Sequence, residues 1–314
     1  MENLYIVLIK FIPVLVLLLI GVLTRKTKLL KSDTIQGLKT LVIYVTLPSL
    51  LFLTFAKTTL EPRYILVILS VLFVCIIMLL LGTRFSKKLC PGNKYYPSVF
   101  SSYEAGMLGF ALFTAFFGTE NTYKFAIVDL GQELFVFFIL LSFLQKQKGS
   151  DINAKQLVLG FIKSPEVLAI AAGIIFSITG LSAYLKGFQI TDSFVGVLTQ
   201  LGSLTAPLIC IAIGYELNID KNNIVKPFLT ALIRMSLMVA FGLLLNEFLF
   251  VRFLKLDSGF GTALFTMYLL PPSFIIPIFI DQDAEKERKP ILSMISINIV
   301  LTLIALLILV SVTA

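Results

Sequence analysis

The sequence predicts an all-α integral membrane protein with ten transmembrane helices, arranged as two inverted five-helix repeats. The 314-residue chain is 58% hydrophobic and has a mean hydropathy of +0.97, far above the values of an ordinary soluble domain. Its apolar residues form long segments separated by short polar connections. The string Thr46-Leu47-Pro48 also recurs 159 residues later as Thr205-Ala206-Pro207. Each half of the chain therefore places a proline inside a long apolar segment.

Ten segments are long enough to cross a bilayer, because about 20 apolar residues span it as a helix. The first segment is expected to stay in the membrane, since its positive charges, Arg25 and Lys26, follow it and no small-residue cleavage site appears. No soluble domain is expected between the spans. The predicted spans run near 4–23, 34–56, 64–82, 98–118, 124–144, 165–185, 193–216, 225–251, 259–280 and 290–313.

The repeats are predicted over 1–150, with spans 1–5, and 151–314, with spans 6–10. An odd number of spans per repeat inverts the second repeat relative to the first. Pro48 in span 2 then corresponds to Pro207 in span 7. Proline removes a backbone donor that lipid cannot replace, so a spanning helix tolerates it only beside protein or a water-filled cavity. Helices broken at matching positions indicate a substrate path.

Spans 4 and 9 correspond in the same register and carry the second pair of predicted interruptions. Pro271-Pro272 interrupts the apolar run of span 9, and Gly106 and Gly109 loosen span 4. The glycines have an alternative role in close helix packing. We expect the two interruptions to meet near mid-membrane.

The distribution of basic residues predicts the orientation. The loops after spans 1, 3, 5, 7 and 9 hold about 17 Lys and Arg residues, and the opposite loops hold about 6. The positive-inside rule places the richer loops in the cytoplasm. Both termini are then predicted to lie on the extracellular or periplasmic side of the cell membrane.

Composition also excludes several functions. The net charge of +8 could suggest nucleic-acid binding, but the basic residues lie in short runs between spans, where they act as topology signals. The chain has no histidine, which excludes histidine acid–base chemistry and histidine metal sites. Cys75, Cys90 and Cys210 have no metal-ligand spacing and are interpreted as small hydrophobic residues. No metal, cofactor or nucleic-acid partner is expected.

Five ionisable residues within the predicted spans stand out as candidates: Lys10, Glu104, Asp129, Glu133 and Arg234. A charge at a helix centre costs at least about 2.5 kcal/mol, so each needs a partner or a function. Asp129 and Glu133 share a helix face at i,i+4, and with Gln132 they form a candidate site for a coupling proton or cation. The alternative is that they hydrogen-bond neighbouring helices.

Arg234 and Glu104 both lie toward the cytoplasmic side of their spans and are candidates for a mutual ion pair. A guanidinium can instead bind a substrate carboxylate through two hydrogen bonds. Lys10 lies near the outer end of span 1 and is expected to extend its ammonium group to the interface.

Four strings resemble the auxin efflux carrier family, which includes bacterial malate and malonate permease-like proteins and is related to the bile acid:sodium symporters. The span-2 string VIYVTLPSLLF resembles the family's proline-centred second helix. Span 7 has the family's pattern of a proline followed seven residues later by glycine, here Pro207 and Gly214 in LTAPLICIAIGYEL. The strings GMLGFALFTAFFG and LLPPSFIIPIFIDQD resemble its two crossing helices.

The resemblance implies a scaffold of spans 1, 2, 6 and 7 and a moving transport domain of spans 3–5 and 8–10. It implies an elevator-like motion, a homodimer formed through the scaffold and a substrate site where the broken spans 4 and 9 cross. Two positions depart from the family: Glu104 replaces its usual asparagine, and Ala111 its usual proline. The candidate substrate-binding residues are Glu104, Gly106, Gly109, Ala111, Arg234, Pro271, Pro272 and Ser273.

The predicted function is secondary transport of a small organic anion, such as malate, malonate or an auxin-like monocarboxylate. Coupling to protons or sodium, or uniport, is left open. The alternatives are a sodium-coupled symporter of a larger organic acid, a non-transporting sensor, and an intramembrane enzyme. The sequence lacks the paired aspartate motifs of membrane proteases and any HExxH motif, so no catalytic residue is expected.

Overall fold

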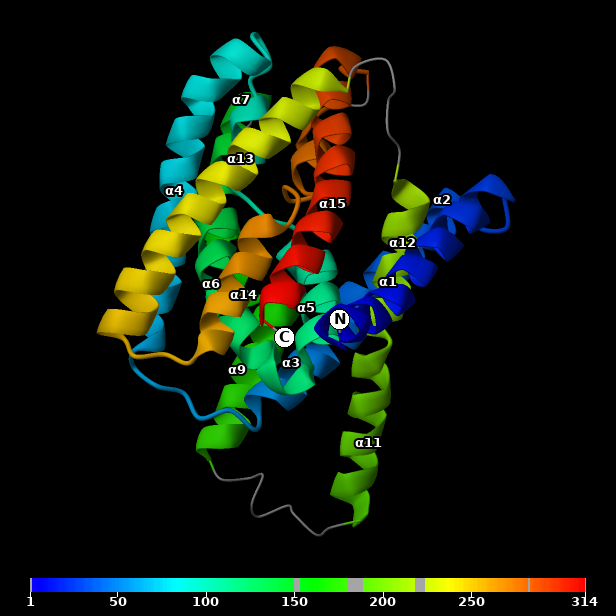
Figure 1. Cartoon of the computed structure of the whole chain (residues 1–314), viewed down its shortest axis with the longest axis vertical. Helices are drawn as coiled ribbons and strands as arrows, with labels where there is room; N and C mark the ends of the chain where they lie inside the picture. The colour runs from blue at the N-terminus through cyan, green and yellow to red at the C-terminus, as the bar shows by residue number, and fades with distance from the viewer. Residues whose placement is uncertain (1, 150–152, 180–188, 218–223, 282, 314) are drawn as a thin grey trace. The chain divides into compact units, whose positions relative to one another are not determined.

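The computed structural model describes residues 2–149, 153–179, 189–217, 224–281 and 283–313, except for the side chains of 2–10 and 189–190 (Figure 1). These residues form helices and connections, with no strand among them. The chain divides into two compact units. Unit 1 comprises Met1–Pro62, Gly106–Ala126 and Ile162–Leu217; unit 2 comprises Arg63–Ala105, Ile127–Phe161 and Asn218–Ala314.

Seven of the described helical segments are long and apolar enough to cross a membrane, and the pair Ala154–Ile162 and Pro165–Ile178 qualifies when taken together. The predicted span 1 falls on α1, where the side chain of Lys10 lies outside the described residues. The predicted span 9 is divided by its interruption. The count of ten spans therefore stays a prediction. The seven segments are Ser32–Phe55, Tyr64–Leu89, Tyr96–Phe117, Thr119–Lys148, Thr191–Glu216, Val225–Phe253 and Glu285–Thr313.

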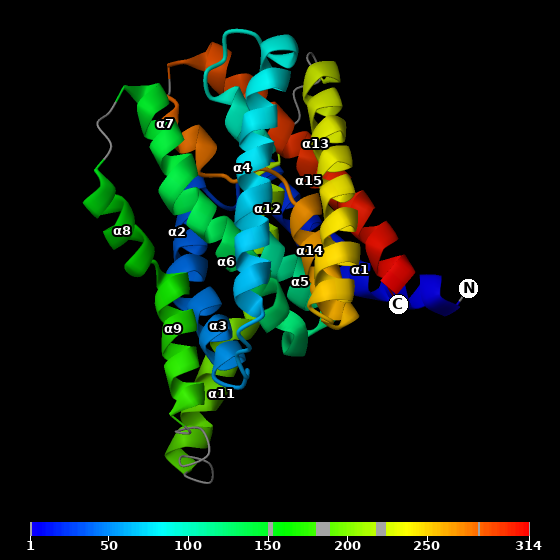
Figure 2. The ribbon, with the colours of Figure 1, turned by 90° about the vertical axis from the view of Figure 1, so that its left-hand side faces the viewer.

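Unit 1 is held together by two helix pairs that are distant in sequence. Helix α1 packs against α12, and α3 packs against α9 (Figures 1 and 2). Small residues allow the close approach, because a Cβ at Gly214 would collide with the carbonyl of Leu18, and one at Gly173 with the backbone of Phe52. The helices are α1 (Glu2–Lys26), α2 (Ser32–Leu41), α3 (Leu47–Phe55), α5 (Phe110–Phe117), α9 (Pro165–Ile178), α11 (Gln189–Ser203) and α12 (Thr205–Glu216).

Pro48 does not break its span, contrary to the expectation from sequence, whereas span 7 is divided into α11 and α12 at Leu204, three residues before Pro207. The segment η1 (Val42–Thr46) is a π-helical turn in which the N–H of Leu47 donates to the carbonyl of Val42. This wider turn accommodates Pro48, which has no N–H to donate, so the helix continues from Ser32 to Phe55. Pro207 lies in the first turn of α12, where its absent N–H has no helical acceptor to lose.

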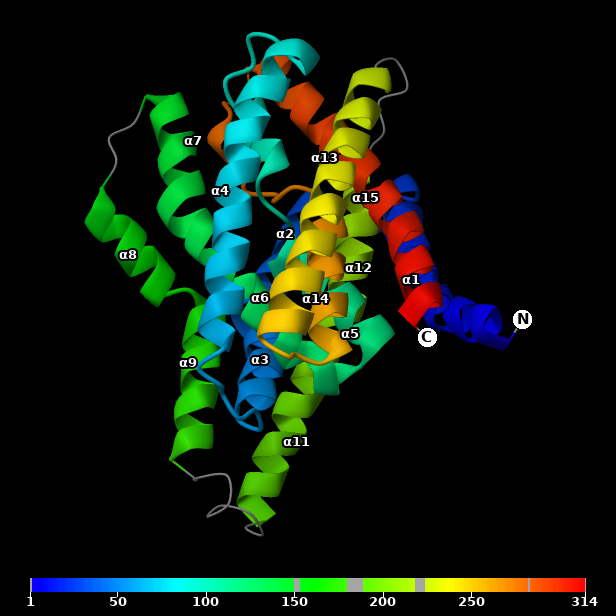
Figure 3. The same cartoon turned by 60° about the vertical axis from the view of Figure 1, so that its left-hand side comes forward.

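Unit 2 contains long helices packed around short irregular segments. Helix α13 packs on α14 and α15 (Figure 3). Helix α4 packs on η2. A Cβ at Gly131 would meet the carbonyl of Ile68, which brings α6 close to α4. The elements are α4 (Tyr64–Leu89), η2 (Tyr96–Phe100), η5 (Val136–Leu140), α7 (Leu141–Lys148), α8 (Ala154–Ile162), α13 (Val225–Leu244), η6 (Leu245–Phe253), α14 (Ser258–Leu269), η7 (Ile276–Phe279), α15 (Glu285–Thr313) and most of α6 (Thr122–Phe135).

The interruption of span 4 lies a few residues before the position that the glycines predicted. The chain leaves regular helix at residues 102–104, whereas Gly106 and Gly109 lie within the π-helical segment η3 (Ala105–Gly109). Ala111 continues the helix in α5. In span 9 the extended stretch follows α14 and contains the double proline, as predicted. Proline disfavours helical geometry in the residue before it, and Leu270 is accordingly extended, with ψ of 154°.

Candidate functional site

The interruptions of spans 4 and 9 lie side by side within unit 2. The main-chain N–H of Glu104 donates to the carbonyl oxygen of Pro271 at 2.8 Å. The N–H of Ser273 donates to the hydroxyl of Ser102 at 3.4 Å. Lipid offers no hydrogen bonds to backbone groups freed from a helix, so these groups must find partners within the protein. Each interrupted segment supplies partners for the other.

The carboxylate of Glu104 also joins the two segments. Its side chain is buried, with 6% of the residue exposed, and Oε2 accepts a hydrogen bond from the N–H of Phe274 at 2.7 Å. Phe274 opens the second half of span 9, where the first N–H groups have no helical acceptor. A charged acceptor makes a stronger hydrogen bond there than a neutral one. The carboxyl group of Glu104 thus lies at the place where the two interrupted spans meet, which we call the crossing.

Arg234 reaches the crossing from α13 and is fully buried. Nη1 donates to the carbonyl of Leu270 at 2.7 Å, and Nη2 donates to the carbonyl of Ser102 at 2.8 Å. Its guanidinium carbon lies 5.0 Å from the ring centre of Tyr103, which stacks on Tyr268 at 5.5 Å. The sequence offered Glu104 or a substrate carboxylate as the partner of Arg234. The structure assigns its two hydrogen bonds to main-chain carbonyls instead.

The remaining candidate substrate-binding residues divide between the two units. Pro271 and Pro272 are buried and Ser273 is half-buried, all in unit 2. Gly106, Gly109 and Ala111 belong to unit 1. There Gly106 faces Glu166 of α9, because a Cβ on Gly106 would lie 2.7 Å from a carboxylate oxygen of Glu166.

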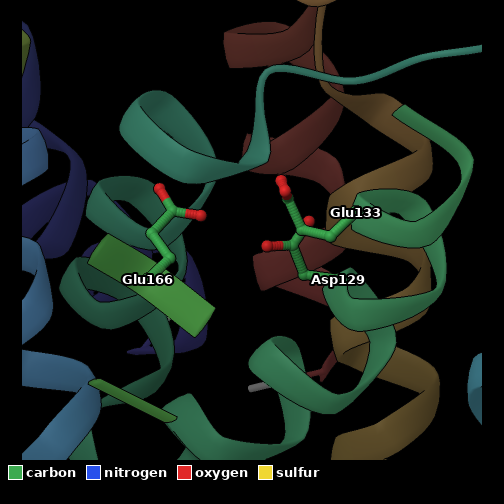
Figure 4. A group of neighbouring side chains, drawn as sticks. All are labelled: Asp129, Glu133 and Glu166. Atoms are coloured by element: carbon green, nitrogen blue, oxygen red, sulfur yellow. The ribbon is translucent and has the colours of Figure 1, made fainter. Parts of the chain in front are cut away.

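Asp129, Gln132 and Glu133 lie on α6. Figure 4 shows the carboxylates of Asp129 and Glu133 projecting from the same side of the helix, as their spacing predicted. Asp129 and Gln132 are buried, and the amide of Gln132 donates to Oδ1 of Asp129 at 3.3 Å. Glu133 is half-buried. Glu166, also labelled in Figure 4, opens α9 of unit 1. A buried carboxylate with an amide neighbour can bind a proton or a small cation.

Several residues at the crossing were not found by reasoning from the sequence. Ser102, Tyr103 and Tyr268 contribute a hydroxyl acceptor and a ring stack. They are neutral residues inside apolar segments, so charge gave no signal for them. Glu166 lies one residue after Pro165, and its acidic charge in the first turn of span 6 was a usable signal.

These features define a class of protein: an all-helical, multi-pass membrane protein in which two interrupted spans meet in the apolar core of one unit. Comparison with known proteins agrees. A family model described as "Membrane transport protein" matches residues 6–310. The chain belongs to this family, that of the auxin efflux carriers, which confirms the resemblance seen in its sequence. The family indicates a transporter rather than an enzyme.

Two archaeal relatives carry matching descriptions. An uncharacterized transporter of Methanocaldococcus jannaschii is 26% identical over 277 residues, which cover 82% of this chain and 86% of the relative. An uncharacterized transporter of Methanothermobacter thermautotrophicus is 26% identical over 216 residues, covering 66% of this chain and 67% of the relative. Both similarities support membrane transport as the function.

Proposed function

We propose that the protein is a secondary transporter of a small organic anion, such as malate, malonate or an auxin-like monocarboxylate. The observation that carries the proposal is the meeting of two interrupted spans in unit 2, where Glu104 N–H bonds to the carbonyl of Pro271. Discontinuous helices that meet within the membrane are the usual substrate and ion sites of secondary transporters. Membership of a transporter family supports the same reading.

We further propose an elevator-type mechanism in which unit 2 moves and unit 1 is the scaffold. The division into units supports this, because segments distant in sequence group as the mechanism requires. Met1–Pro62 and Ile162–Leu217, which hold spans 1, 2, 6 and 7, belong to unit 1, and the segments of spans 3, 5 and 8–10 belong to unit 2. Gly106–Ala126, which carries the second half of span 4, groups with unit 1 and departs from the simple scheme.

The inverted repeat with ten spans is part of the proposal. Thr46 and Thr205, which the repeat register makes equivalent, are both buried, and their hydroxyl oxygens lie 3.0 Å apart. Two equivalent residues touch each other when they lie beside a local two-fold axis. The helix packing follows the same two-fold relation. Span 1 packs on span 7 (α1 on α12) and span 2 packs on span 6 (α3 on α9), and spans 1 and 2 correspond to spans 6 and 7 in the repeat.

The function is tested by uptake into proteoliposomes. Purified protein is reconstituted and offered labelled mono- and dicarboxylates, with and without proton and sodium gradients. We expect saturable uptake of at least one carboxylate that protein-free liposomes lack. Uptake that requires sodium and prefers a larger organic acid favours the alternative, a symporter resembling the bile acid carriers, for which Asp129 and Glu133 are the candidate ion ligands. Absence of uptake for every carboxylate contradicts organic-anion transport.

We propose that the protein lies in the cell membrane as a homodimer formed through unit 1, with both termini outside. The orientation gives a direct prediction. Cysteine is introduced at Lys26 or Lys87 in a background without Cys75, Cys90 and Cys210. An impermeant thiol reagent should label neither position in intact cells and both after permeabilisation, because these lysines lie in the more basic loops. Labelling of position 26 from outside intact cells contradicts the orientation.

A further inference from the structure

Arg234 is the most deeply buried charged side chain at the crossing. It belongs to α13, within the apolar segment Val225–Phe253, and is 0% exposed. A guanidinium at such a position is costly unless it has strong partners. Its two terminal nitrogens bond to main-chain carbonyls, and among the described residues its Nε has no hydrogen-bond partner. The side chain is therefore committed to the backbone of the interrupted spans.

Both carbonyls that Arg234 binds lie close to a helix end, one in each interrupted span. Leu270 directly follows the last residue of α14, and Ser102 lies two residues after the end of η2. Carbonyls at the end of a helix lack helical donors and carry its partial negative charge. A planar guanidinium can satisfy two such acceptors at once in a fixed geometry, which the point charge of lysine cannot reproduce. One side chain thus compensates both interruptions.

The first repeat carries no second arginine for this purpose. The position 159 residues before Arg234 (234 − 75 = 159) is Cys75 on α4, at the same offset that relates Thr46 to Thr205. Cys75 is 0% exposed and belongs to unit 2 with Arg234. A small side chain there leaves a single guanidinium to serve both interrupted spans.

We propose that Arg234 is a positioning residue that fastens the two interrupted spans to each other, and that it does not bind the substrate. All its hydrogen bonds lie within unit 2, so the crossing keeps its geometry when that unit moves. The statement that unit 2 moves depends on the proposed elevator function. The role of Arg234 in joining the two spans does not depend on it, because all the groups involved lie within unit 2.

A cross-linking experiment tests the fastening without any transport measurement. Ser102→Cys and Ser273→Cys are combined in the cysteine-free background, since the Ser102 hydroxyl lies 3.4 Å from the N–H of Ser273. A short bifunctional methanethiosulfonate should link them efficiently. Arg234→Met, which keeps an apolar stem and removes every donor, should lower the cross-linking yield and the temperature of thermal aggregation. Arg234→Lys should give intermediate values of both.

A matched control removes another arginine of the same segment. Arg252 is paired with Glu247 near the end of η6, at 2.7 Å, and its side chain is 66% exposed. Arg252→Met should leave the cross-linking yield and thermal aggregation at the values of the parent protein. If Arg234→Met gives the parent yield, the fastening is wrong. If Arg234→Met is not recovered from membranes, Arg234→Lys decides by the same yield.

The transport measurement separates positioning from substrate binding. For Arg234→Lys in proteoliposomes, we expect the maximal rate to fall by about tenfold, the effect of losing one favourable contact of ordinary strength, with KM unchanged. A KM raised by tenfold with the parent cross-linking yield identifies Arg234 as a substrate ligand and overturns the proposal. If the parent protein itself transports no carboxylate, the proposed function fails, and the cross-linking result still decides the role of Arg234.

Discussion

Replacing Pro272 with leucine is expected to abolish transport while leaving the protein in the membrane. Pro272 is buried in the extended stretch after α14, whose carbonyls bond to Arg234 and Glu104. Leucine permits helical geometry at this position and in the residue before it, which proline disfavours. The extended stretch would then lose the geometry that presents its carbonyls to the crossing. Uptake should fall on the order of a hundredfold, the loss that a misplacement of about 1 Å can cause where reacting groups must be aligned.

The matched control is Pro277→Leu, the same substitution in η7 of the same span. Pro277 takes no part in the hydrogen bonds that join the two interruptions in the described structure, so this variant should retain most of the parent uptake. Membrane content is measured for both variants by quantitative immunoblotting. Parent rates of uptake in Pro272→Leu would show that the double proline has no role in transport.

Neutralising the coupling carboxylate is expected to remove the dependence of uptake on the ion gradient. The candidates are Glu104, Asp129 and Glu133, tested as Glu104→Gln, Asp129→Asn and Glu133→Gln. In Glu104→Gln the amide oxygen can still accept the N–H of Phe274, so the substitution removes the charge and keeps the hydrogen bond. Glu104 is the first candidate, because its carboxyl group lies at the crossing.

The sign of the pH effect follows from linkage. If transport requires the protonated carboxyl group, uptake falls as the pH rises through its pKa, by about tenfold per unit above that value. The neutral variant should show a flat profile, while exchange of substrate between two loaded compartments survives, because exchange needs only the substrate site and the moving unit. The same comparison made across a sodium gradient tests sodium coupling.

Glu247→Gln is the control for this series. Glu247 lies in η6 and forms an ion pair with Arg252, and 49% of its side chain is exposed. Its neutralisation should leave the ion dependence at the parent level. If all three candidate variants also keep the parent ion dependence, the carboxylates are structural and the coupling hypothesis is wrong.

The positions of most membrane segments were determined by the sequence alone. Seven of the predicted spans coincide with long apolar helices, among them 34–56 with Ser32–Phe55 and 225–251 with Val225–Phe253. The double proline also located the interruption of span 9 correctly. These properties are local, since apolar length decides whether a segment can span a bilayer and proline restricts its own neighbours. The family resemblance, which the family model confirmed, also rests on local features, because contiguous strings of residues carry it.

Only the tertiary structure decided how the interrupted segments are stabilised. A π-helical turn accommodates Pro48 without breaking the helix. The interruption of span 4 lies at residues 102–104 rather than at Gly106 and Gly109. Arg234 binds carbonyls that are 36 and 132 residues away in the chain. Backbone carbonyls are identical in every residue, so no side-chain pattern announces that one of them accepts a distant guanidinium. Which groups meet depends on how α13 packs against the two interrupted spans, and packing is not a local property of the sequence.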